Sequence, residues 1–217
     1  MNEEYRKYIM EKFFVEDFFE ESPDGTYELE EADPGGETLL HFYVPGKHSM
    51  AVRNLDKKKT DFLFFRNEKA LSLKKRTDHI VFEQKENGSW TVHLIEMKSS
   101  VTTKEKWLEI KGKFRASYLF VLAASAILHI KIEHIRMYTT YEKETISEGC
   151  MTCMPENPVL KRVRTGEAPG MPAKEWNGGE FELRFGDNCR LPFLHIPVRV
   201  CRNEESRYLE GCYSCTS

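Results

Sequence analysis

Residues 78–98 read DHIVFEQKENGSWTVHLIEMK, and this stretch decides the fold class. Its two runs rich in β-branched, aromatic and other apolar residues, 78–83 and 90–95, are typical of strands. Between them, Glu86-Asn87-Gly88 is a turn signal, because asparagine and glycine readily adopt the backbone angles of tight loops. The stretch therefore predicts a β-hairpin.

Two registers of this hairpin are open. A two-residue turn at Asn87 and Gly88 would place Asp78 opposite Met97. A three-residue loop, with Gly88 in the left-handed conformation, would place Asp78 directly opposite Glu96. Glycine is the residue that this longer loop favours, and in that register the two carboxylates share one face of the hairpin.

The segments on either side of the hairpin indicate an α/β fold. Short apolar runs at 38–44 and 61–65 predict strands before it. After it, Thr102 or Thr103 can cap a helix that reaches about residue 128, basic in its first half and almost wholly apolar in its second. A strand is then predicted at 130–141. This order of elements indicates a mixed central β-sheet flanked by helices.

Composition divides the chain into three parts. Residues 1–37 predict an acidic segment, with a helix at 3–20 and then turns, and residues 38–148 predict the α/β core. Residues 149–217 are richer in Gly, Pro and Cys, with strand-like runs at 181–185 and 191–200. They predict a β-rich extension packed on the core.

The net charge of −3 conceals a strong asymmetry. Residues 1–37 hold 13 acidic and three basic side chains, a net of −10, whereas residues 38–217 hold 29 basic and 22 acidic ones, a net of +7. A basic body suits a polyanionic partner, so the mild overall acidity does not exclude nucleic acid. For the acidic segment we consider two roles, masking of the basic body and contact with a partner protein.

The pattern of Asp78, Glu96 and Lys98 resembles the PD-(D/E)XK, or restriction-endonuclease-like, nuclease superfamily. In that superfamily an acidic residue opens one strand of a hairpin and an acid-x-lysine triplet lies on the next, as Glu96-Met97-Lys98 does here. The resemblance covers about residues 60–141, with Thr77 where the family has proline. It implies a restriction-endonuclease-like core and a metal-dependent nuclease that hydrolyses phosphodiester bonds in DNA or RNA.

Elementary chemistry explains the pattern. Two carboxylates at one edge of a sheet can bind a hard cation such as Mg²⁺ or Mn²⁺, which polarises a phosphate and lowers the pKa of a bound water. Lys98 lies two residues after Glu96 on the same strand face, from which it can orient that water and offset charge on the phosphoryl oxygens. We therefore expect Asp78 and Glu96 to bind the metal and Asp78, Glu96 and Lys98 to be catalytic.

Other acid-x-lysine triplets occur at Asp56-Lys58, Glu83-Lys85 and Glu109-Lys111. A rival set of Asp61, Glu83 and Lys85 has a similar form, but Glu83 and Lys85 run into the hairpin turn. Glu109 and Lys111 lie on the predicted helix. In the register of the three-residue loop, His79 and His93 project away from Asp78, so we expect them to have structural roles.

Basic residues bracket the predicted site in the sequence. Lysine and arginine contacts to phosphates supply affinity without sequence specificity. The candidates for nucleic-acid contact are Lys74, Lys75, Arg76, Lys104, Lys106 and Lys111. Trp107 could stack on a base, but a core position against the sheet is the preferred interpretation.

All six cysteines lie in residues 150–217, and four of them form the CxxC pairs Cys150/Cys153 and Cys212/Cys215. Two such pairs suit a tetrahedral structural Zn²⁺, because each short turn presents two thiolates to one ion. The alternatives are an iron–sulfur cluster or ordinary buried thiols.

Several classes of protein find no support in the sequence. It has no Gly-rich phosphate loop, no GxSxG elbow and no HExxH motif. The N-terminus is charged throughout, and the longest apolar run, 116–130, is shorter than the roughly 20 residues that span a bilayer. We therefore expect a cytoplasmic protein without a membrane partner.

Two other functions are kept beside the nuclease. The first is a non-catalytic nucleic-acid-binding or regulatory protein that retains a nuclease-like fold. The second is a small metal-clamped interaction module whose activity lies in the C-terminal part. A homodimer is a further hypothesis, since cleavage of both strands of a duplex often calls for two active sites.

Overall fold

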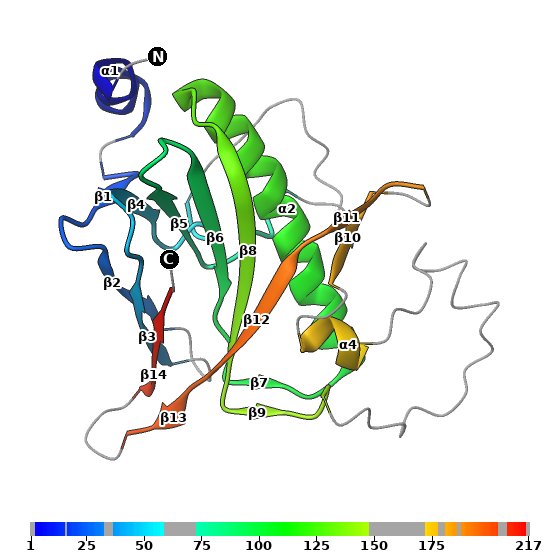
Figure 1. Cartoon of the computed structure of the whole chain (residues 1–217). Helices are drawn as coiled ribbons and strands as arrows, with labels where there is room; N and C mark the ends of the chain where they lie inside the picture. The colour runs from blue at the N-terminus through cyan, green and yellow to red at the C-terminus, as the bar shows by residue number, and fades with distance from the viewer. Residues whose placement is uncertain are drawn as a thin grey trace.

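The structure is a computed structural model that describes residues 3–15, 17–32, 37–58, 73–147, 172–177, 181–185, 188–203 and 208–215. Its centre is a six-stranded sheet in the order β1-β4-β5-β6-β8-β12 (Figure 1). These strands are β1 (Glu20–Glu21), β4 (His48–Val52), β5 (His79–Gln84), β6 (Trp90–Glu96), β8 (Ile132–Tyr141) and β12 (Leu194–Arg199). Neighbours from β1 to β6 are antiparallel, whereas β6, β8 and β12 run parallel, so the predicted mixed sheet is confirmed.

The hairpin of β5 and β6 has the three-residue loop. Gln84 pairs with Trp90, and His79 pairs with Ile95. Gly88 has a φ of 80°, the left-handed conformation that this loop requires, and its amide donates a hydrogen bond to the carbonyl of Lys85 at 2.9 Å. Asp78 and Glu96 each lie one residue beyond the pair of His79 and Ile95, so they face each other. The register with the two-residue turn is therefore excluded.

Helix α2 (Lys104–Leu128) lies along one face of the central sheet (Figure 1). It begins as predicted, with the hydroxyl of Thr103 accepting a hydrogen bond from the amide of Lys106 at 3.2 Å. Its apolar side chains, such as Phe114 and Val121, share a core with Leu94 and the other β6 residues that face the helix. This packing explains the apolar residues on the inner face of the second half of the helix, whereas Leu122 and Ile127 are exposed.

A second sheet covers the opposite face of the central one. Its order is β13-β14-β3-β2, formed by β13 (Cys201–Arg202), β14 (Leu209–Ser214), β3 (Thr38–Tyr43) and β2 (Thr26–Glu31). Tyr27 and Phe42 of this sheet pack in one cluster with Val81 and Ile95 of the central sheet. Strands β2 and β14 belong to the acidic segment and the C-terminal extension, so both of these parts are built into the sheets.

The remaining elements are short. They are α1 (Glu3–Phe13), β7 (Ser100–Val101), β9 (Lys143–Glu144), α4 (Pro172–Trp176), β10 (Glu182–Arg184) and β11 (Arg190–Pro192). The first helix ends at Phe13, earlier than predicted, and the chain turns at Asp17 (φ 57°) where Phe14, Phe18 and Phe19 pack against one another. The predicted strand at 61–65 lies outside the described residues. Among the residues that the structure describes, no helix is both long enough and apolar enough to cross a bilayer.

A buried polar group joins the C-terminal extension to α2. Glu175 of α4 accepts a hydrogen bond from the indole of Trp107 at 2.9 Å and pairs with the ammonium of Lys111 at 2.7 Å. Trp107 is fully buried, which confirms its predicted core position. Lys111 and Glu175 are each buried as well, so the ion pair lies inside the protein.

Protonation of His195 is expected to destabilise the protein in mild acid. Its buried ring hydrogen-bonds the Trp176 carbonyl at 2.9 Å and the Thr139 hydroxyl at 3.0 Å, and burial lowers its pKa from 6.5 to about 4. Between these two values the unfolded chain binds the proton and the folded chain does not, so the free energy of unfolding falls as the pH falls from 6.5 towards 4.

The variant His195→Gln should remove about 3 kcal/mol of this pH dependence, measured by urea unfolding at several pH values across that range. His134→Gln, at an exposed position, is the matched control. Equal pH dependence of unfolding in the wild-type protein and His195→Gln would contradict the assignment.

Candidate functional site

Asp78 and Glu96 lie at the start of β5 and the end of β6, on the face that α2 covers. Asp78 is 1% exposed and Glu96 is fully buried. The ammonium of Lys113 lies 3.5 Å from Oδ1 of Asp78 and 2.7 Å from Oε1 of Glu96, and so links the two carboxylates. Asp78 and Glu96 therefore both contact Lys113, at the join between the hairpin and the helix, and their binding of a common metal ion stays a prediction.

Lys98 reaches the same pair of carboxylates from the hairpin itself. Its ammonium lies 2.6 Å from Oε1 of Glu96 and 4.0 Å from Oδ2 of Asp78, and it donates to the carbonyl of Met97 at 2.7 Å. Two hydrogen bonds to Thr140 of β8, at 2.8 and 3.0 Å, fix the backbone of Lys98. The three residues of the sequence motif thus form one cluster.

The fold holds Asp78 firmly in place. Its Oδ2 accepts the amide hydrogen of Met97 at 2.6 Å, across the open end of the hairpin. The preceding residue, Thr77, hydrogen-bonds the hydroxyl of Ser117 through its amide at 2.8 Å and its side chain at 2.9 Å. Ser117 lies one helical turn after Lys113, so the same stripe of α2 contacts both Thr77 and Asp78.

Lys113 was counted among the basic residues of the helix but was not expected in the site. In the sequence it is one of several lysines in a basic amphipathic half-helix, and nothing in that pattern separates it from its neighbours. The available sequence signal is its spacing of four residues from Ser117, which places the two side chains on one face of the helix. That signal becomes useful only once the packing of α2 against the hairpin is known.

Two further carboxylates, Glu31 and Asp56, join Asp78 from outside the hairpin. One oxygen from each of the three lies within 4.8 Å of the others, an arrangement that could hold a metal ion. Asp56 follows β4 in a turn whose Leu55 amide donates to the carbonyl of Asp78 at 2.7 Å. Glu31 ends β2, where the alternation of Tyr27, Leu29 and Glu31 turns all three side chains inwards.

Neither Glu31 nor Asp56 was predicted as a site residue. Asp56 was noted only as part of a competing acid-x-lysine triplet. The sequence signal for Glu31 is the alternation of Tyr27, Leu29 and Glu31 with exposed residues, which is typical of a strand. The acidic residues around it make this pattern hard to recognise. Both residues reach Asp78 through the pairing of distant strands, which the local pattern does not reveal.

The electrostatics of the cluster show an excess of negative charge. Burial, and then the neighbouring Asp78, raise the pKa of Glu96 to about 7, although Lys98 and Lys113 act in the opposite direction. Burial and Asp78 likewise raise the pKa of Asp56. Burial disfavours the charged form of Lys113, but Glu96 and Asp78 outweigh it and raise the pKa of this lysine. A further cation near the carboxylates would relieve their mutual repulsion.

The donor set fits a hard divalent cation. Carboxylate oxygens are the ligands that Mg²⁺ and Mn²⁺ prefer, and those of Glu31, Asp56 and Asp78 lie within 4.8 Å of one another. Among the residues that the structure describes, Oε2 of Glu96 and Oδ1 of Asp56 are buried and have no hydrogen-bond partner. Such buried oxygens are costly unless something binds them, so they are sites where a cation would be stabilised.

Of the rival set, Glu83 lies on the other face of the hairpin, with Lys85 beside it. Oε2 of Glu83 pairs with Nε2 of His93 at 3.1 Å and its Oε1 with Lys85 at 2.9 Å, while Nδ1 of His93 lies 3.0 Å from the hydroxyl of Tyr138. His79 is also buried there and accepts the amide of Asn54 at 3.3 Å. The predicted orientation of both histidines is confirmed. Asp61 lies outside the described residues.

The predicted nucleic-acid contacts divide into two groups. Lys74 and Lys75 are exposed, and Lys104 and Lys106 are half-buried on the first turn of α2. Two others need correction. Lys111 is buried against Glu175, and Arg76 is buried with its guanidinium donating to the carbonyl of Lys58 at 2.8 Å. Both side chains bind groups of the protein itself, so neither suits a surface contact with nucleic acid.

The structure describes only one of the two CxxC pairs, Cys212 and Cys215. Cys150 and Cys153 lie outside the described residues. Cys212, on β14, is exposed, whereas Cys215, just after it, is buried 3.8 Å from Nδ1 of His93 and 3.6 Å from the Tyr138 hydroxyl. A shared structural Zn²⁺ stays a prediction.

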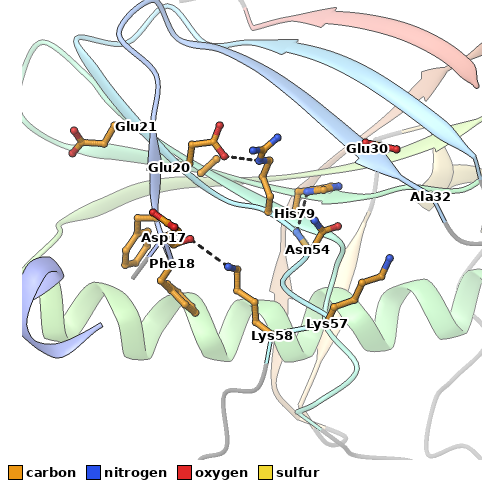
Figure 2. A pocket seen from close by; sticks show the side chains of 13 residues that line it. Asp17, Phe18, Glu20, Glu21, Glu30, Ala32, Asn54, Lys57, Lys58 and His79 are labelled. Atoms are coloured by element: carbon orange, nitrogen blue, oxygen red, sulfur yellow. Dashed lines mark hydrogen bonds and ion pairs between the residues drawn. The ribbon is translucent and has the colours of Figure 1, made fainter. Parts of the chain in front are cut away.

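A pocket of about 1020 Å³ opens beside the turn that carries Asp56 (Figure 2). Basic residues on the wall of this pocket contact residues of the acidic segment. Arg53 pairs with Glu20 at 2.5 Å, and Lys58 donates to the carbonyl of Asp17 at 3.5 Å. Lys57, also on the wall, pairs with Glu31 at 3.3 Å. These contacts fit the masking role considered for the acidic segment.

The site thus combines a hairpin end, one stripe of α2 and a turn held against Asp78. The buried carboxylates of Asp78 and Glu96 are paired with the ammonium groups of Lys98 and Lys113. No family model matches the chain, and neither does any curated protein or solved structure.

Proposed function

We propose that the protein is a metal-dependent nuclease with a PD-(D/E)XK-type site, hydrolysing phosphodiester bonds in DNA or RNA. The observation that carries the proposal is the cluster of Asp78, Glu96 and Lys98, whose charged groups lie within 4.0 Å of the lysine ammonium. The register of the hairpin, which sets Asp78 opposite Glu96, supports it. So does α2, which follows the motif and packs on the face that bears it.

In this proposal Asp78 and Glu96 hold Mg²⁺ or Mn²⁺, with Asp56 and Glu31 as nearby carboxylates. When bound, the cation supplies charge stabilisation and an activated water. Lys98 orients the water and offsets charge on the phosphoryl oxygens. The oxygen of water forms a bond to phosphorus, the bond to the leaving oxygen breaks, and solvent takes the proton of the water and protonates the leaving group.

Substrate contact would come from basic residues that remain accessible. Lys74, Lys75, Lys104 and Lys106 are the members of the predicted set that are exposed or half-buried. They would bind the phosphates of either nucleic acid without reading its sequence.

One observation favours the alternative, a non-catalytic nucleic-acid-binding or regulatory protein. Lys98 and Lys113 both pair with Oε1 of Glu96, so the protein itself supplies positive charge to this carboxylate. A protein of that kind would bind Mn²⁺ weakly or not at all and would cleave nothing.

Cleavage of single- and double-stranded DNA and RNA in Mg²⁺ or Mn²⁺ separates the two functions. We expect strand cleavage that EDTA abolishes, and a loss of about 100-fold or more in Lys98→Ala, because its ammonium would act on charge that develops in the transition state. Lys131→Ala, at an exposed lysine just after α2 and outside the proposed site, is the matched control, and circular dichroism checks that both variants fold. Unchanged cleavage by Lys98→Ala would overturn the assignment of Lys98.

A further inference from the structure

We propose that Lys113 is a second functional lysine, which serves as an internal counter-ion of Glu96 and Asp78 and moves to the scissile phosphate when a divalent cation binds. The inference rests on the proposed function and assigns a role to a residue outside its sequence motif. It explains why two ammonium groups converge on one buried carboxylate oxygen.

The first step is the crowding at Glu96. Lys98 and Lys113 lie 2.6 and 2.7 Å from the same oxygen, Oε1, whereas Oε2 is buried and finds no hydrogen-bond partner within the described ranges of the chain. A divalent cation bound to this carboxylate would lie close to both ammonium groups. The repulsion between like charges in a buried site is strong, so one lysine would leave as the cation arrives.

The second step identifies which lysine leaves. Lys98 has a further hydrogen bond to the Met97 carbonyl at 2.7 Å, and Thr140 holds its backbone. In the described part of the chain, the hydrogen bonds of the Lys113 ammonium go to the two carboxylates alone. Both carboxylates would become metal ligands, so Lys113 loses its binding partners when the metal binds and Lys98 keeps one.

The third step is where Lys113 goes. The side chains of Lys113 and Lys98 are 15% and 19% exposed, so both lysines lie at the edge of the cluster rather than in the closed core. A phosphate bound to the cation would approach from that open side, and a lysine is a compact charge on a flexible stem that can follow it. There Lys113 would neutralise charge on a phosphoryl oxygen, and it would exchange no proton or covalent bond.

The test compares Lys113→Met and Lys113→Gln with the wild-type protein and with Lys131→Met, at an exposed lysine outside the proposed site. Calorimetric titration with Mn²⁺ alone measures cation affinity, and single-turnover cleavage at saturating Mn²⁺ measures the chemical step. We expect Mn²⁺ to bind about tenfold more tightly to both Lys113 variants, because a competing cation is gone, and cleavage to slow at least about tenfold. Lys113→Gln retains a donor for Glu96, which guards against loss of the fold.

The two readouts separate this inference from the proposed function. Unchanged or weaker Mn²⁺ binding in both variants would overturn the role of Lys113, since a structural lysine has no reason to oppose a cation. Tighter Mn²⁺ binding with unchanged cleavage would overturn the movement to the phosphate. If the wild-type protein cleaves no nucleic acid, both the nuclease and the movement of Lys113 to a scissile phosphate fail, while the titration still decides the counter-ion.

Discussion

Replacing Asp78 by Asn is expected to lower metal-dependent cleavage by about 1000-fold or more without unfolding the protein. Asparagine keeps an oxygen for the Met97 amide, which Asp78 accepts at 2.6 Å, so the end of the hairpin stays closed. It removes the charge of the carboxylate that lies between Glu96 and the Glu31–Asp56 pair. A bound cation contributes several kcal/mol of transition-state stabilisation, and about 1.4 kcal/mol corresponds to a factor of ten in rate.

The measurement is the initial rate of cleavage in Mn²⁺, together with Mn²⁺ titration and circular dichroism. Glu86→Gln is the matched control, because Glu86 is an exposed carboxylate at the far end of the same hairpin. Cleavage by Asp78→Asn within about threefold of the wild-type rate would show that Asp78 is not a metal ligand that the reaction needs.

Replacing Glu175 by Ala is expected to give a large loss of stability, about 3–5 kcal/mol in the free energy of unfolding. Glu175 pairs with Lys111 at 2.7 Å and accepts the indole hydrogen of Trp107 at 2.9 Å, and all three side chains are buried. Alanine leaves a buried ammonium without a counter-ion and a buried donor without an acceptor. Urea unfolding followed by tryptophan fluorescence measures the loss.

A double variant distinguishes the lost charge partner from lost packing. Lys111→Met combined with Glu175→Leu removes both charges and keeps much of the side-chain volume, so it should be far more stable than Glu175→Ala. Lys106→Met, on the surface of the same helix, should have little effect. A loss below about 1 kcal/mol in Glu175→Ala would mean that this ion pair does not hold α4 against α2.

The local patterns of residues 78–141 predicted the central elements well. The hairpin, the Thr103 cap and the strand that follows α2 all depend on signals within a few residues, such as turn chemistry and hydrophobic periodicity. Gly88 is the sharpest example, since its left-handed conformation fixes the loop length and therefore the partner of Asp78. The predicted cluster of Asp78, Glu96 and Lys98 follows from that one register.

The short edge strands and the acidic segment were harder to predict. Residues 26–31 are exposed at every second position, and Glu28, Glu30 and Glu31 make the segment acidic, so β2 resembles a charged loop until its buried side chains are known. Strand β14 carries a glycine and a cysteine among polar residues, a weak strand signal, yet it pairs in parallel with β3. Parallel pairing joins segments far apart in the chain and leaves no local trace in the sequence.

The sequence by itself determined the hairpin and placed the charged triad near its open end, because these depend on residues that are neighbours along the chain. It left two registers open, and the structure selected the one with the three-residue loop. Only the tertiary structure decided which other groups reach that triad. Lys113 arrives through the packing of α2, and Glu31 and Asp56 through the second sheet and the turn after β4. Charges from three distant segments meet there because burying the apolar faces of the helix and the sheets brings those segments together, a condition that concerns the whole fold.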